Sequence, residues 1–255
     1  MVKNKKKIGL LIELGEFGAY SLRILKGFST IFKYRKEFLL QVVHIGISAM
    51  PIICIASFFM GAITGIQMGA AINYVISGSA SLVSGGVVIA LVREMIPVLT
   101  ALVVVSRICS SVTAEIGSMV VTEQVDALRV MSINPEEYIG VPRVLTGMIT
   151  VPIIGTIAIL IGIIGAWISM LLIHDVPTYS FFQSGLSILI LRFYIESFFK
   201  LTIFGLILLL IATFYGFRTV GGSAGVGNAT VKAVVVGTGT TILVDYVVGT
   251  FFLML

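Results

Sequence analysis

Long runs without any charged residue alternate with short polar stretches along this chain. Residues 38–92 contain no Asp, Glu, Lys or Arg, and neither do residues 144–173 or 201–217. A helix needs about 20 apolar residues to cross a bilayer, so the first run is long enough for two spans, or for one span and a re-entrant piece. The pattern predicts five spanning helices, at about 40–72, 85–112, 144–173, 198–217 and 231–253. Counts of four or six spans stay open, because 38–92 and 176–200 can be divided differently.

The first 37 residues follow a different pattern. Residues 8–37 show helical spacing of apolar positions, with basic residues on or near the other face. This spacing predicts an amphipathic helix that lies in the membrane interface, and a flexible basic tail is the alternative. The sequence therefore divides into an interfacial segment, 1–37, and a single transmembrane domain, 38–255. The apolar positions are Ile8, Leu11, Ile12, Gly15, Ala19 and Leu22, and the basic ones are Arg23, Lys26, Lys33, Arg35 and Lys36.

Composition supports a membrane location. Hydrophobic residues make up 58% of the chain and charged residues only 11%, with a mean hydropathy of +1.11. Soluble domains carry about 25% charged residues, so this chain needs lipid to cover its apolar surface. The fold class predicted is an all-α integral membrane protein.

The excess of positive charge is concentrated at the N-terminus. Residues 1–37 hold nine Lys and Arg against three Glu, and the whole chain has a net charge of +5. In so apolar a chain an anionic membrane surface is a better partner for this charge than nucleic acid. With five spans, most of the other basic residues fall on the same side as the N-terminus, which places that side in the cytoplasm.

Residues suited to catalysis are not apparent. His44 and His174 lie too far apart to suggest a metal site, and no Ser, His and Asp combine in a recognisable arrangement. The stretch from Gly221 to Thr230 superficially resembles a phosphate-binding loop, but it lacks the lysine and the preceding strand that such a loop requires. We expect no enzymatic activity, no metal and no cofactor bound by this chain.

Three of the ionisable residues within the predicted spans stand out as candidates for a functional site. Arg93 and Glu94 end the long uncharged run, just before Pro97, and Asp245 lies in the last span. Charges at membrane depth are costly and suggest a functional site. The alternatives are a boundary pair that reaches the headgroups for Arg93 and Glu94, and a hydrogen bond between packed helices for Asp245.

Small residues recur at helical spacing in two places. Gly61, Gly65 and Gly69 form one stripe, and Ser106, Ser110 and Ala114 form another. Such stripes let membrane helices approach closely, so we expect helix packing at both. In the same stretch as the second stripe, Arg107 and Glu115 are two helical turns apart and are candidates for an ion pair.

A short amphipathic helix is expected between the second and third spans, within about 122–134. Thr122 is placed to cap it, its acids Glu123 and Asp126 come early, and Arg129 comes late, as the helix dipole favours. The sequence Asn134-Pro135 ends it. This helix suits docking to a cytoplasmic protein, and the alternative is an ordinary solvated loop helix.

The stretch LVREMIPVLTALVVVSRICSSVTAEIGSMVVTEQVDALRVMSINP, with Pro142-Arg143 after it, strongly resembles the MlaE family of lipid-transport permeases. The resemblance covers nearly the whole chain, including the basic N-terminus, Ser223 to Gly225 and Asp245. It implies the permease subunit of an ATP-driven ABC transporter that moves phospholipids between the inner and outer membranes of Gram-negative bacteria and so maintains outer-membrane lipid asymmetry.

The resemblance also implies partners. They are a cytoplasmic ABC ATPase, which would bind ATP and Mg²⁺, a periplasmic MCE-domain protein, a possible STAS-domain protein and a second copy of this chain in a homodimer. The permease would lie in the bacterial inner membrane with its N-terminus in the cytoplasm.

Carried onto this sequence, the resemblance assigns two sets of residues. The set that would couple to the ATPase is Glu123, Gln124, Asp126, Ala127 and Leu128. The set that would bind lipid in an outward-facing cavity is Ile72, Val75, Arg93, Glu94 and Met95.

Two other classes of function compete with this reading. An ion- or proton-coupled secondary carrier would use Glu94 and Asp245 as a relay, since membrane carboxylates do form such relays. It leaves the elaborate helix near Glu123 unexplained. A membrane enzyme acting on lipids is the other rival, and the lack of a nucleophile–base or metal set disfavours it.

Overall fold

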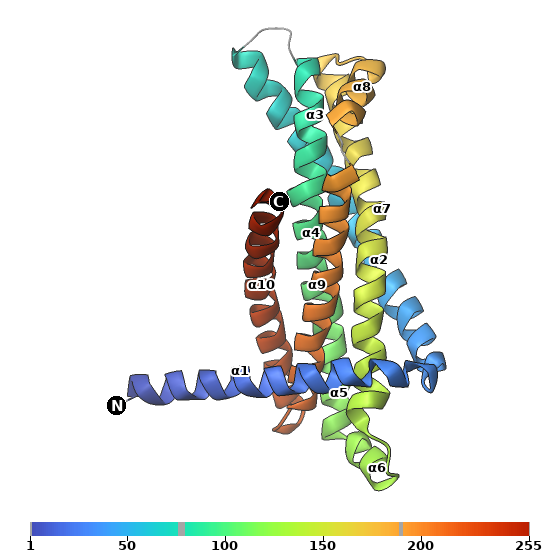
Figure 1. Ribbon diagram of the computed structural model, residues 1–255, viewed down its shortest axis with the longest axis vertical. Helices are drawn as coiled ribbons and strands as arrows, with labels where there is room; N and C mark the ends of the chain where they lie inside the picture. Colours follow the sequence, from blue (N-terminus) through green and yellow to red (C-terminus); the bar gives the residue numbers. More distant parts are fainter. Residues whose placement is uncertain (1, 76–79, 189–190, 255) are drawn as a thin grey trace. The chain divides into compact units, whose positions relative to one another are not determined.

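The computed structural model describes the backbone of residues 2–75, 80–188 and 191–254, and the side chains of residues 11–71, 83–185 and 191–254. Within these ranges the chain is helical with no strand (Figure 1). Five helical stretches there are long and apolar enough to cross a membrane, which confirms the predicted fold class. They are Arg35–Ala71, Val83–Val121, Glu136–His174, Leu191–Phe217 and Gly222–Met254.

Each span is longer than the one predicted from the sequence, because the helices continue through polar residues at one or both ends. The clearest case is the last helix, which begins at Gly222, whereas the sequence predicts a loop as far as residue 230. The elements are α1 Val2–Lys26, η1 Gly27–Phe32, α2 Arg35–Val75, α3 Ala80–Ala90, η2 Leu91–Met95, α4 Ile96–Val103, η3 Val104–Cys109, α5 Ser110–Val121, α6 Gln124–Val130, η4 Glu136–Gly140, α7 Val141–His174, α8 Thr178–Ile188, α9 Leu191–Phe217 and α10 Gly222–Met254.

The chain forms two compact units, each built from three separate segments. The first unit comprises Met1–Ile45, Val105–Gly147 and Leu206–Thr238. The second comprises Gly46–Val104, Met148–Gly205 and Gly239–Leu255. Each of the five long spans contributes residues to both units, so neither unit is a continuous piece of sequence.

In the first unit α1 packs against the end of α9 through aromatic rings. The ring centroids of Phe17 and Phe214 lie 5.3 Å apart, and those of Tyr20 and Phe214 lie 5.6 Å apart. Tyr20 and Ile24 are buried there, and burial raises the pKa of the Tyr20 phenol. Helix α1 is therefore a packed part of this unit and not a flexible tail.

The outer face of α1 carries apolar residues that the spacing predicts for a membrane-facing side, Leu11, Ile12 and Leu22. Polar side chains on α1 turn toward the protein: the Tyr215 hydroxyl donates to Glu13 at 3.0 Å, and Arg23 donates to both carboxylate oxygens of Glu136, at 2.8 and 3.0 Å. Leucines are left exposed instead, at Leu11, Leu14, Leu22 and Leu25. An exposed apolar face beside polar anchoring contacts is what a helix in the membrane interface requires.

In the second unit α2 and α7 approach closely at glycines. A Cβ on Gly61 would overlap the carbonyl oxygen of Gly162, and one on Gly165 would overlap that of Phe58. A Cβ on Gly65 would lie 2.6 Å from the hydroxyl of Ser169. The predicted glycine stripe thus lies against α7, where only hydrogen side chains leave room for two backbones.

We expect Gly61→Ala to destabilise the permease, because the added methyl group meets backbone that cannot rotate away. Overpacking of this kind costs about 1–3 kcal/mol. Thermal unfolding of the detergent-purified protein measures the effect. Gly46→Ala on the same helix is the matched control, since its Cβ would lie 3.9 Å from Thr150, an ordinary contact. Equal melting temperatures for the two variants would contradict the packing argument.

Candidate functional site

The second unit contains a cluster of charged side chains that begins in a widened helical turn. Residues Leu91–Met95 form a π-helical turn, η2, between α3 and α4. Such turns occur frequently at functional sites. Pro97 follows and has no amide hydrogen, so it cannot make the usual helical bond to the carbonyl of Arg93, four residues earlier. This carbonyl is therefore available to a side chain from another helix.

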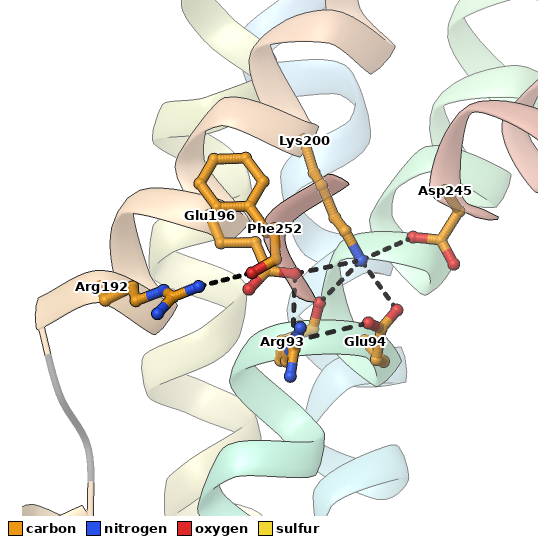
Figure 2. Close-up of polar contacts among 7 residues, drawn as sticks. All are labelled: Arg93, Glu94, Arg192, Glu196, Lys200, Asp245 and Phe252. Carbon is orange, nitrogen blue, oxygen red and sulfur yellow. Dashed lines mark hydrogen bonds and ion pairs between the residues drawn. The ribbon is translucent and has the colours of Figure 1, made fainter. Parts of the chain in front are cut away.

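Lys200 on α9 uses that carbonyl and lies at the centre of the cluster (Figure 2). Its Nζ lies 3.3 Å from the Arg93 carbonyl oxygen and 2.8 Å from Oε2 of Glu94. It is also 3.0 Å from Oδ1 of Asp245 and 3.9 Å from Oε1 of Glu196. One ammonium group thereby contacts residues of three helical segments.

Arg93 completes the cluster from its other side. Its Nε donates to Oε1 of Glu196 at 3.0 Å and lies 3.9 Å from Oε1 of Glu94. The guanidinium also stands over the ring of Phe193, 5.7 Å from the centroid. Glu196 is 1% exposed, so its carboxylate depends on Arg93 and Lys200 for compensation.

Helix α10 meets the cluster at Asp245 and Gly249. Asp245 and Gly249 are one turn apart, and a Cβ on Gly249 would lie 3.4 Å from Nζ of Lys200. A larger side chain at this position would push into the ion pairs. Near its end α10 is held to α9 by Arg192, which donates to the carbonyl oxygen of Phe252 at 2.6 Å, as Figure 2 shows. This carbonyl lies in the last turn of the helix, where it has no intrahelical partner.

The balance of charge and exposure suggests what the cluster can do. Three carboxylates, Glu94, Glu196 and Asp245, surround two cations, so the formal charge is −1 when all are ionised. Lys200 is not exposed at all, whereas 44% of the Glu94 side chain is exposed. The buried ions hold the helices together, and Glu94 presents a carboxylate at the accessible edge, where a polar ligand group can meet it.

The lipid-site residues predicted from the sequence lie in different surroundings. Arg93 and Glu94 are in the cluster, and Met95 beside them is 45% exposed. Ile72 and Val75 belong to the end of α2, and their side chains lie outside the described residues. Among the described residues, no group of three His, Cys, Asp or Glu could hold a metal ion.

Sequence reasoning missed two members of the cluster. It placed Glu196 in a mixed segment before the fourth span, partly on the membrane surface, and Lys200 near the boundary of that span. The structure has them on the same face of α9, four residues apart, well inside a helix that begins at Leu191. Their spacing was a usable signal, because Glu and Lys four residues apart pair on a helix. Asp245, for which the sequence left a functional site and a helix-packing contact open, forms an ion pair with Lys200 of α9.

The helix predicted for docking forms in the first unit, with a different start. Helix α6 covers Gln124–Val130, and Glu123 precedes it with a positive φ of 60°. Thr122 does not cap it, since the Thr122 hydroxyl donates back to the carbonyl of Ser118 at 2.8 Å. Val125 is buried and fixes the helix to the unit. Glu123, Gln124, Asp126 and Ala127 are exposed, and Leu128 is half-buried.

The surroundings of α6 include a cavity of about 400 Å³. Leu128 and Met131 line one side of it, and Glu115 and Arg143 form an ion pair of 2.7 Å on another. Glu115 thus pairs with Arg143, where the sequence suggested Arg107. The second predicted stripe of small residues is only partly covered: Ser106 is exposed, and Ser110 and Ala114 are half-buried. The buried contact of α5 comes from Thr113, whose hydroxyl donates to the carbonyl of Ala212 at 3.0 Å.

Comparison with known proteins identifies the family. The family described as Permease MlaE matches residues 38–251. A probable ABC transporter permease protein of Rickettsia conorii is 30% identical over 248 residues, which cover 97% of this chain and 95% of that protein. A probable ABC transporter permease protein of Synechocystis is 33% identical over 219 residues, which cover 86% of this chain and 81% of that protein. With its five membrane-spanning helices, the chain therefore belongs to the MlaE permease family and is the permease subunit of an ABC transporter.

Proposed function

We propose that this permease moves phospholipids between the inner and outer membranes and so maintains outer-membrane lipid asymmetry. The observation that carries the proposal is the half-exposed Glu94 carboxylate, at the edge of an otherwise buried ion cluster and beside the exposed apolar Met95. A lipid needs both kinds of surface, a few polar groups for its headgroup and apolar side chains for its acyl chains.

A permease of an ABC transporter implies a separate ATPase subunit, and α6 is the element best suited to meet it. The acidic Glu123, just before α6, and Asp126 on it are exposed, and the apolar Leu128 is half-buried. The buried Val125 holds this short helix to the first unit. ATP and Mg²⁺ would be bound by the ATPase and not by this chain. Closure of the ATPase would move α6, and a rigid-body shift of packed helices would carry the movement to the lipid site.

The remaining assembly follows the family resemblance. The permease acts as a homodimer in the bacterial inner membrane, with its N-terminus and α6 in the cytoplasm. A periplasmic MCE-domain protein exchanges lipid with it, and a STAS-domain protein accompanies the ATPase. The basic residues of the first 37 positions support this orientation, since nine Lys and Arg there would face the cytoplasmic side.

We expect Glu123→Lys to reduce association with the ATPase at least about tenfold, because a reversed charge in an interface costs more than about 1.4 kcal/mol. The amount of ATPase that co-purifies with the tagged permease from membranes measures it. Membrane insertion should be unchanged, since Glu123 is exposed.

Asp175→Lys is the matched control for this prediction. Asp175 is also an exposed acid with a positive φ, of 50°, but it lies between α7 and α8. It should leave co-purification unchanged. Undiminished ATPase with Glu123→Lys, or an equal loss with both variants, would argue against docking through α6.

We expect Glu94→Gln to lower the rate of ATP-driven phospholipid transfer at least about tenfold, which corresponds to an increase of about 1.4 kcal/mol in the activation free energy. The amide retains an oxygen that accepts from Lys200, so the fold should persist while the charge at the accessible edge is lost. Transfer of a fluorescent phospholipid in proteoliposomes that contain the ATPase measures the rate.

Glu137→Gln serves as the control, because Glu137 belongs to the first unit, outside the cluster, and accepts a local hydrogen bond from Asn134 at 3.0 Å. The same assay discriminates the rival function. Transfer that continues without ATP and stops when the pH gradient is collapsed would mean a secondary carrier and would overturn the proposal.

A further inference from the structure

The first unit contains a second polar cavity, which the proposed transport function does not use. It has a volume of about 530 Å³ and opens between α1, the end of α9 and the start of α10. Its polar lining residues are Glu13, Glu16, Tyr215, Arg218, Thr219, Asn228 and Lys232. The ion cluster around Lys200 belongs to the second unit, so the two sites share no residue.

Charges of both signs line this cavity. Glu16 and Arg218 form an ion pair across it, and Glu13 accepts from the Tyr215 hydroxyl at 3.0 Å. Lys232, by contrast, is exposed and makes no hydrogen bond or ion pair with any residue in the described part of the chain. The cavity thus offers a cation that is not yet neutralised, close to carboxylates that are still partly accessible.

The surface of α10 next to the cavity is apolar. Val231 and Val235 are 62% and 65% exposed, and they continue up the same helix from Asn228 and Lys232. On α1, Leu11 is 67% exposed and lies beside Ile12, which lines the cavity. A polar cavity that opens onto exposed apolar side chains of membrane helices matches an amphiphile, with its headgroup in the cavity and its acyl chains along the valines.

We propose that this cavity binds the headgroup of a zwitterionic phospholipid from the surrounding bilayer leaflet. Lys232 and the Asn228 amide donate to the phosphate, because ammonium and amide groups are good phosphate donors. Glu13 receives the ammonium of an ethanolamine-type headgroup. Arg218 already neutralises Glu16, but Glu13 has no cationic partner among the described residues. A purely anionic headgroup would leave the Glu13 carboxylate uncompensated, so the mixed lining favours a zwitterion. The lipid would hold α1 in the membrane interface independently of transport.

The first test removes the cation. Lys232→Ala should reduce binding of phosphatidylethanolamine to the delipidated full-length permease about tenfold, or about 1.4 kcal/mol, because the phosphate loses a charge-assisted hydrogen bond. Native mass spectrometry at increasing lipid concentration measures it. Lys36→Ala, at another exposed lysine of the first unit, is the matched control and should bind as the unaltered protein does. Equal binding by the two variants would overturn the proposal.

The second test concerns the ammonium. Glu13→Gln keeps an acceptor for Tyr215 but removes a negative charge, so it should weaken binding of phosphatidylethanolamine and should not weaken binding of phosphatidylglycerol, which has no ammonium and is repelled by the carboxylate. An unchanged ratio of the two affinities would exclude recognition of a zwitterion. Competition by free phosphoethanolamine at equal concentration would show that the headgroup alone is the ligand, against the proposed role of the valines.

A third measurement identifies the occupant in membranes. A photo-crosslinking amino acid at Val235 should capture phospholipid in the unaltered chain and lose it with Lys232→Ala. Capture of a protein subunit at this position would overturn the lipid assignment. ATP-driven lipid transfer should persist at a measurable rate in Lys232→Ala, so failure of the transport proposal and failure of this one are distinguishable.

Discussion

Lys200 carries a positive charge within a helix that is apolar enough to cross a membrane, and none of its side chain is exposed. Such a charge is stable only with close counter-charges and hydrogen-bond acceptors, since the desolvation of one ion costs several kcal/mol. Glu94, Glu196 and Asp245 supply the charges, and the carbonyl freed by Pro97 supplies an acceptor. Helices α9, α10 and the turn before α4 must therefore keep one arrangement in the second unit.

The same constraint explains local features that look unfavourable in isolation. A proline within a span, a π-helical turn and a glycine at position 249 each weaken a helix by itself. Here the proline frees an acceptor, the turn holds the Arg93 and Glu94 side chains at the cluster, and the glycine admits α10. The charged site and the helix packing are thus one structure, with Glu94 left at the accessible edge.

The first unit is organised by contacts of a different kind. Helix α1 turns its acids and Arg23 toward the protein, where Tyr215, Arg218 and Glu136 receive them, and leaves its leucines outside. Periodicity predicts the helix correctly, because a period of 3.6 residues is visible in the sequence. It also predicts the apolar face, since Leu11 and Leu22 are exposed there, whereas only the folded structure decides which residues the polar side chains of α1 pair with.

The sequence alone predicts membrane-spanning helices and favours five of them, since the length of an apolar run is sufficient information for a span. The division of 38–92 and 176–200 comes from the structure. The sequence also determines that Arg93 and Glu94 need an explanation and that an exposed acidic helix follows near Glu123. Tertiary structure decides how the charges are compensated. Arg93 and Glu196 are 103 residues apart, and no local pattern pairs them. The cost of a buried charge is a property of one residue, whereas its compensation depends on which helices pack together.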